Sequence, residues 1–158
     1  MTNAETVAYF QDLVNTNKLL ISFFISTTQM KEATRSSVDY PCLVLHEDFE
    51  MMLEGQPDTP LLTEVRSVMV LMQPNSEQHE AITEAQDIAR SALIQAIAYI
   101  IHRNNAERAN YKAGKFIKIH QQPIRPVLGY GSDKLYGYRL FYTHQDSTSF
   151  TKKLADWI

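Results

Sequence analysis

Residues 46–50 hold the densest group of side chains that could carry out chemistry. His46, Glu47, Asp48 and Glu50 bring one imidazole and three carboxylates close together. Such groups bind divalent metals or transfer protons, so this stretch is the candidate site of a small metal-dependent enzyme. Successive residues of a strand point to opposite faces, however, which separates Glu47 from His46 and Asp48. The end of a buried strand that emerges into solvent is the favoured interpretation.

No nucleophile in the sequence has an evident catalytic partner. Cys42 lies inside the apolar run PCLVL, where a thiol behaves as a small hydrophobic side chain. As the single cysteine it cannot form an intrachain disulfide, which suits assembly in a reducing compartment. Residues 129–131, GYG, lack the third glycine and the helix of a dinucleotide-binding loop. We therefore expect no cofactor and no metal, and assign no catalytic residue.

Aromatic side chains gather near the C-terminal end, in and before the run KLYGYRLFYTH. Next to Lys134 and Arg139 they could stack on nucleic-acid bases, but aromatics of paired strands more often pack across the sheet. The alternative function is therefore a binding module that uses an aromatic sheet face. A formal net charge of -3 favours neither DNA nor an anionic membrane, and we expect no sequence-specific nucleic acid as partner. The aromatic residues are Tyr130, Tyr136, Tyr138, Phe141 and Tyr142.

Charge is unevenly distributed along the chain. No lysine or arginine occurs between Arg35 and Arg66, and we call residues 39–64 the acidic segment. Residues 103–125, the basic segment, contain only one acidic residue, Glu107. If the two segments lie on opposite flanks, copies of the chain can associate head to tail, and such contacts close into rings. Taken alone, the pattern is more typical of a solvated surface with uneven charge.

A long amphipathic helix, expected at residues 76–104, is the element around which the other segments must pack. Ile82, Ala85, Ala89, Ala92 and Ala96 recur at steps of three and four and form its apolar seam. A first helix is expected at residues 2–16, and residues 49–60 read as an exposed loop with Gly55, Pro57 and Pro60. Strands are expected at residues 19–27, 41–48, 61–72, 115–121 and 134–144.

These elements predict an α+β fold in which a mixed or mainly antiparallel sheet packs against the long central helix and the N-terminal helix. The 158 residues suit a single domain spanning 1–158, with residues 147–158 as a candidate docking tail. No signal peptide is evident, and no apolar stretch reaches the roughly 18 residues that a membrane-spanning helix needs. We expect a soluble protein that is made inside the cell.

The order of elements and several phrases resemble a known class of proteins. The phrases are VAYFQDLV, DYPCLVL, VRSVMVLMQ and GYRLFYTH, around the loop and the long helix. They are similar to small structural proteins of Bacteroidetes phages and prophages, and the α+β order resembles that of tail terminator proteins. The acidic loop and the aromatic tail of this sequence depart from that pattern.

The resemblance implies a non-enzymatic virion protein, a tail terminator or neck-ring subunit. It implies a homo-oligomeric ring, expected to be a hexamer, that caps the tail tube and joins it to the head or neck. The implied partners are the tail tube and the neck or connector proteins, and the implied location is the virion tail or neck after assembly in the host cytoplasm. With the charge pattern, we expect the contact between subunits to join Glu47, Asp48, Glu50 and Glu54 to Arg108, Lys112, Lys115 and Lys118.

Overall fold

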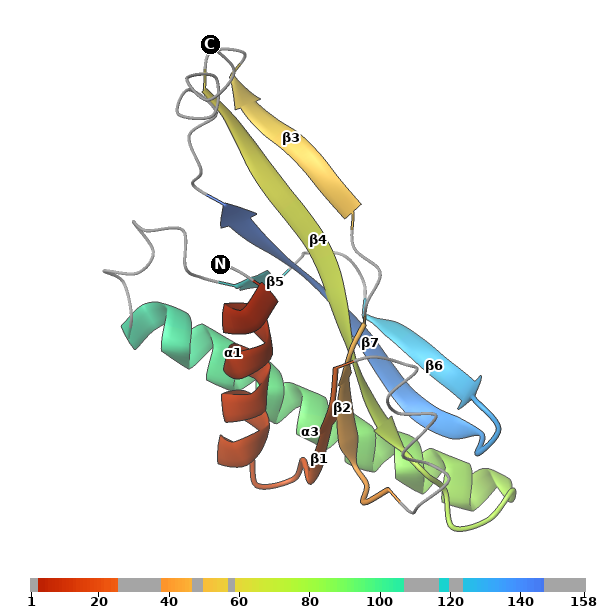
Figure 1. Ribbon diagram of the computed structural model, residues 1–158. Coiled ribbons are helices and arrows are strands. Elements are labelled where there is room, and N and C mark those ends of the chain that lie inside the picture. Colours follow the sequence, from red (N-terminus) through yellow and green to blue (C-terminus); the bar gives the residue numbers. More distant parts are fainter. Residues whose placement is uncertain are drawn as a thin grey trace.

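The computed structural model describes residues 3–25, 38–46, 50–56, 59–106, 117–119 and 124–146 (Figure 1). Within these ranges the chain forms a seven-stranded mixed sheet and two helices, which confirms the predicted α+β class. The helices are α1 (Asn3–Thr16) and α3 (His79–Ala106). The strands are β1 (Ser22–Phe24), β2 (Cys42–Leu45), β3 (Glu50–Gln56), β4 (Thr59–Met72), β5 (Lys118–Ile119), β6 (Arg125–Tyr130) and β7 (Leu135–Asp146).

The sheet is built around the long antiparallel pair β4 and β7 (Figure 1). Its order is β1-β2-β4-β7-β5, while β3 pairs with the first part of β4 and β6 with the first part of β7. Only β1 and β2 run parallel, so the sheet is mixed but mainly antiparallel. One edge therefore consists of β3 and β1, and the other of β5 and β6.

Both helices lie on the same face of the sheet. Phe10 and Leu13 of α1 share one core cluster with Ala89 and Ala92 of α3 and with Leu140 of β7. On the opposite face, which we call the outer face, a smaller cluster contains Cys42, Val44, Met69, Leu71 and Leu135. The alternation along each strand thus divides its side chains between two cores, as expected for a sheet covered on both sides.

A hydrogen-bonded group joins α1 to the last turns of α3. The Tyr99 hydroxyl donates to Asp12 Oδ2 at 2.6 Å, and Arg103 Nη1 donates to the same oxygen at 2.9 Å. The Arg103 guanidinium also lies 4.6 Å from the centre of the Tyr9 ring. Arg103 therefore holds the helices together, and this member of the basic segment has its partner within its own chain.

The alanine seam of α3 is buried against the sheet, as the spacing of its alanines predicted. Ala89 and Ala92 are 0% exposed and let the helix backbone lie close to the sheet. We expect Ala92→Leu to lower the free energy of unfolding by about 2 kcal/mol, because the larger side chain has no room. Ala98→Leu, at an exposed position of the same helix, should change it by less than about 0.5 kcal/mol. Urea unfolding of both variants tests this, and equal losses would contradict the close packing.

Two predicted boundaries are wrong, and β6 was not among the expected strands. The expected loop 49–60 contains β3, which forms a hairpin with β4, and the expected strand 19–27 forms strand only at Ser22–Phe24 among its described residues. Pro126 lies inside β6, an edge strand, where a missing N–H is tolerated. Residues 147–158, the candidate docking tail, lie outside the described residues, and the single-domain prediction stays a prediction. No helix among the described residues is long and apolar enough to cross a membrane.

Candidate functional site: two charged edges of one sheet

Of the eight residues predicted to form the subunit contact, two have described side chains. Glu50 and Lys118 are both exposed, on β3 and β5. Glu54 lies on β3, but its side chain is not described. The others lie outside the described residues: Glu47, Asp48, Arg108, Lys112 and Lys115.

Glu50 and Lys118 lie at the two ends of one row across the sheet. Glu50 is opposite Val65 of β4, Val65 is opposite Thr143 of β7, and Thr143 is opposite Lys118. Residues directly opposite in antiparallel strands share a face, so both charges belong to the outer face. Three strand spacings separate their Cα atoms by about 14 Å. The negative and the positive side chain thus occupy opposite edges of the same molecule.

The strand that carries Glu50 extends beyond the rest of the sheet. The pairing of β4 with β7 ends at Leu62 and Asp146, while the pairing with β3 continues to Gln56 and Thr59. Figure 1 shows this hairpin of β3 and β4 projecting past both helices. In the part of the chain that the structure describes, β3 pairs only with β4. Its outer edge therefore presents backbone N–H and C=O groups that an added strand can pair with.

Two members of the charged segments have partners within the chain. Glu64 of the acidic segment lies 2.8 Å from Arg66, whose side chain is almost buried. Arg103 of the basic segment binds Asp12, as described above. Each of these pairs contributes to folding and is not available to a neighbouring copy. The sequence therefore overstates how much of the charge in each segment belongs to a surface.

The predicted aromatic face is divided by the sheet. Tyr142 is fully buried in the core beneath the helices, and Tyr138 packs against that same core. Tyr136 lies opposite Met72, which also faces the helices. Phe141 and Tyr130 lie on the outer face, Phe141 beside two arginines and Tyr130 against the smaller core. No continuous surface of the five aromatics exists, which corrects the prediction of an aromatic sheet face.

The group around His46 is only partly described. His46 follows β2, is half-buried, and donates its backbone N–H to the carbonyl oxygen of Ser67 at 3.0 Å. Glu47 and Asp48 lie outside the described residues, and Glu50 belongs to the next strand. The residues that the structure describes contain no group of His, Cys, Asp or Glu arranged to hold a metal. The hypothesis of a metal-dependent enzyme at residues 46–50 stays a prediction.

Cys42 is buried in β2, as its apolar neighbours predicted. Burial raises the pKa of its thiol to about 12, above the ordinary 9.0. The unfolded chain therefore loses this proton at lower pH than the folded chain. The contribution of the protonated thiol to the free energy of unfolding is fully present below about pH 9 and is lost between about pH 9 and 12. We expect urea unfolding to show a loss of stability from about pH 9 to about pH 10.5, and this loss should be smaller in Cys42→Ala. The loss of stability that remains in Cys42→Ala is assigned to Tyr40, whose pKa is also raised. An equal loss in both proteins would contradict the assignment to Cys42.

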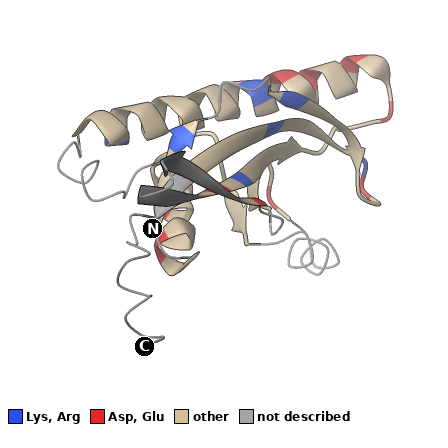
Figure 2. Ribbon diagram, turned by 90° about the horizontal axis from the view of Figure 1, so that it is seen from above, with Lys and Arg blue, Asp and Glu red and all other residues tan. Residues whose placement is uncertain are grey.

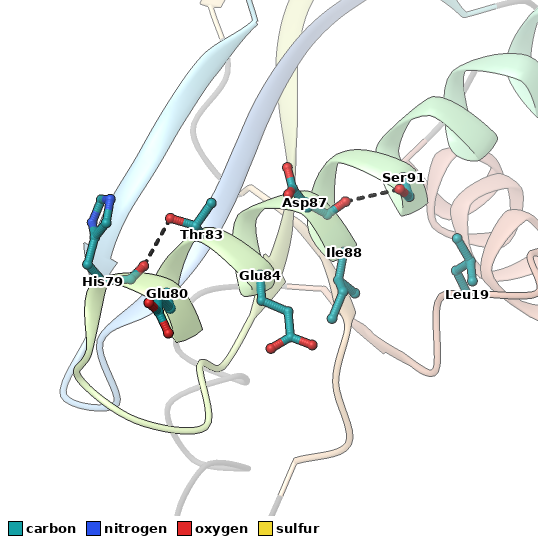
Figure 3. Close-up of a pocket in the computed structure, with 8 residues that line it drawn as sticks. All are labelled: Leu19, His79, Glu80, Thr83, Glu84, Asp87, Ile88 and Ser91. Carbon is teal, nitrogen blue, oxygen red and sulfur yellow. Dashed lines mark hydrogen bonds between the residues drawn. The ribbon is translucent and has the colours of Figure 1, made fainter.

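An open groove of about 880 Å³ runs along the first half of α3 (Figure 3). Glu80, Glu84 and Asp87 make it acidic, and Figure 2 shows acidic residues at the end where the helix begins. Its hydroxyls, Thr83 and Ser91, donate to the carbonyl oxygens four residues earlier, at 2.9 and 3.0 Å. Such bonds are ordinary on a helix surface, and they leave neither hydroxyl paired with a general base.

The comparisons with known proteins add no family to this geometry. No protein-family model matches the chain, and no curated protein matches it either.

Proposed function

We propose that the chain is a non-enzymatic structural subunit of a phage virion, a tail terminator or neck-ring protein. In this proposal copies associate head to tail through the two sheet edges, close into a ring, and cap the tail tube. The ring joins the tube to the head or neck, after assembly in the host cytoplasm. The phage assignment and the hexameric ring rest on the resemblance of the sequence, including DYPCLVL and GYRLFYTH.

The observation that carries the head-to-tail contact is the row from Glu50 to Lys118. A subunit of a ring needs two different complementary surfaces, because the same surface on both partners gives a two-fold dimer instead. Glu50 and Lys118 lie at opposite edges on the same face, so the acidic edge of one copy can meet the basic edge of the next without inverting it. The distance between the edges excludes a direct ion pair inside one molecule.

The projecting hairpin supports the same contact. Between Thr59 and Leu62, β4 has β3 as its one described neighbour. Among the described residues, no further strand pairs with either long side of this hairpin end. Exposed strand edges in monomers are usually protected by charges that oppose edge-to-edge pairing. In a head-to-tail ring the same charges select one partner edge, because acidic edges repel each other and attract the basic edge.

Cross-linking of two single-cysteine variants tests the direction of the contact. Met51→Cys on β3 and Ile124→Cys before β6 change exposed neutral residues at the two edges and leave the charges intact. A flexible bismaleimide should join the two variants when they are mixed, and should join neither variant to itself. The wild-type chain is the control, because its buried Cys42 should not react.

Two results would contradict the proposal. Efficient cross-linking of Met51→Cys to itself would indicate a two-fold contact, which cannot continue into a ring. No cross-link in any mixture, at concentrations where native mass shows one species, would indicate a monomer. Binding to purified tail tubes then tests the virion role separately, since a ring that ignores tubes would leave only the assembly part of the proposal.

A further inference from the structure

Two arginines and one phenylalanine form a compact group on the outer face. Arg125 of β6 and Arg139 of β7 lie directly opposite each other. Their guanidinium carbons lie 5.7 and 4.9 Å from the centre of the Phe141 ring. Figure 2 shows basic residues on the strands as well as on α3. We call Arg125, Phe141 and Arg139 the twin-arginine site.

The placement of the two arginines costs stability in the isolated chain. Like charges directly opposite on paired strands repel each other. No described carboxylate forms an ion pair with Arg125 or Arg139. Among the described residues, the one hydrogen bond of the Arg139 side chain is donated by its Nε to Ser67 Oγ, at 2.9 Å. That contact orients the Arg139 guanidinium and leaves its terminal nitrogens without a described partner. An anion bound between the two guanidiniums would replace the repulsion by charge-assisted hydrogen bonds.

The geometry favours a carboxylate over a nucleic-acid base. Both guanidiniums lie over the Phe141 ring, so the ring is already stacked and offers little face to a base. A stacked guanidinium keeps its N–H groups in its own plane, where they can bind both oxygens of a carboxylate. Ser67 is almost fully buried, so the anchor of Arg139 is part of the sheet and not a mobile surface group.

The chain itself contains an occupant of matching charge. Its acidic segment has no lysine or arginine between Arg35 and Arg66, and the described acid Glu50 lies on the same outer face at the far edge. The twin-arginine site lies beside the other edge, because Arg125 belongs to the edge strand β6. In a head-to-tail contact the acidic edge of one copy approaches this side of the next copy.

We propose that the twin-arginine site binds carboxylates of the acidic segment of a second copy of this chain. This proposal rests on the head-to-tail assembly proposed above and assigns its basic side to Arg125 and Arg139, in addition to Lys118. It also assigns the role of Phe141, which holds the two guanidiniums on the sheet.

Substitutions of the two arginines test the site in the assembling protein. Arg139→Gln and Arg125→Gln should each weaken association about tenfold, because each removes charge-assisted hydrogen bonds to carboxylates. Arg139→Lys should give a partial loss, since lysine keeps the charge but not the paired donors. The matched control is Arg90→Gln on the exposed side of α3, which removes the same charge away from the outer face and should leave association within about twofold. Sedimentation measures association, and circular dichroism confirms that each variant is folded.

A peptide separates this proposal from the assembly on which it rests. A labelled peptide of residues 46–58 should bind the wild-type chain, and its affinity should fall at least about tenfold with Arg125→Gln or Arg139→Gln. The same peptide with every Asp replaced by Asn and every Glu by Gln should not bind. If the chain stays monomeric but binds the peptide in this way, the site stands and the ring fails. If rings form and neither substitution affects assembly or peptide binding, the site is overturned and the ring stands. Tighter binding of a single-stranded oligonucleotide at the same residues would overturn the choice of a carboxylate ligand.

Discussion

Gly137→Ala should prevent the chain from folding. A Cβ atom at this position would lie 1.9 Å from the carbonyl oxygen of Val70 and 3.1 Å from the Cα atom of Leu71. Both contacts are to the backbone of β4, which cannot move aside as a side chain does. Because β4 and β7 form the central pair of the sheet, their separation there would affect both cores. We expect a loss of more than about 4 kcal/mol, a large share of the stability of a typical domain.

Gly131→Ala is the matched control for this prediction. The same methyl group would meet nothing within 4 Å at Gly131, whose φ of +72° is the one obstacle. An alanine in this conformation costs about 1 kcal/mol, so this variant should fold with a lowered unfolding midpoint. Soluble yield, circular dichroism and urea unfolding compare the two. A folded Gly137→Ala variant that is as stable as Gly131→Ala would show that the two strands do not approach this closely.

Reversal of charge on the acidic edge should have the second-largest effect. The paired change Glu50→Lys with Glu54→Lys turns two attractions across the proposed contact into repulsions. At about 1 kcal/mol or slightly more for each reversed residue, association should weaken about a hundredfold. Adding Lys118→Glu to these chains should recover part of the loss, because the contact then regains opposite charges. Sedimentation at low and moderate salt measures the change, which screening should reduce.

The control for this experiment uses the same change of charge on another surface. Glu80→Lys with Glu84→Lys alters two exposed acids of α3, which cover neither sheet edge. Net charge then rises equally in both variants, so a general effect of charge would weaken them equally. Equal weakening, or an unchanged edge variant, would contradict a contact at β3.

The helices could be predicted from the sequence with few errors. The seam of alanines at steps of three and four predicted a helix at residues 76–104, and α3 spans His79–Ala106. A first helix was expected at residues 2–16, and α1 spans Asn3–Thr16. These predictions succeed because helix periodicity is local. The packing that fixes it, between the seam and Val68, Val70 and Leu140, then follows from the apolar face itself.

The hairpin could not be predicted because its sequence signals a loop. Gly55, Pro57 and Pro60 are typical of turns, and Met51 is exposed. Strand pairing with β4, from Glu50 opposite Val65 onward, overrides these signals. Proline is tolerated at position 60 because that part of β4 lies beyond the last residue paired with β7. Such pairing depends on residues that are near in space, and propensity at single positions does not express it.

The candidate site could be predicted only as two charged segments. Their opposite positions required the register that links Glu50 to Lys118 through two intervening strands. The twin-arginine site had one visible signal, Arg139 two residues before Phe141, which places both on one face of a strand. Arg125 could not be joined to it without the pairing of β6 and β7.

Native mass as a function of protein concentration and salt tests the central claim most directly. A head-to-tail contact between two different edges should give one closed oligomer of defined size, expected to be a hexamer, which dissociates as salt rises. The double variant Glu50→Lys with Glu54→Lys should shift this equilibrium toward the monomer under the same conditions. A monomer at every concentration and salt, for the wild-type chain alone and with tail tubes present, would contradict the account.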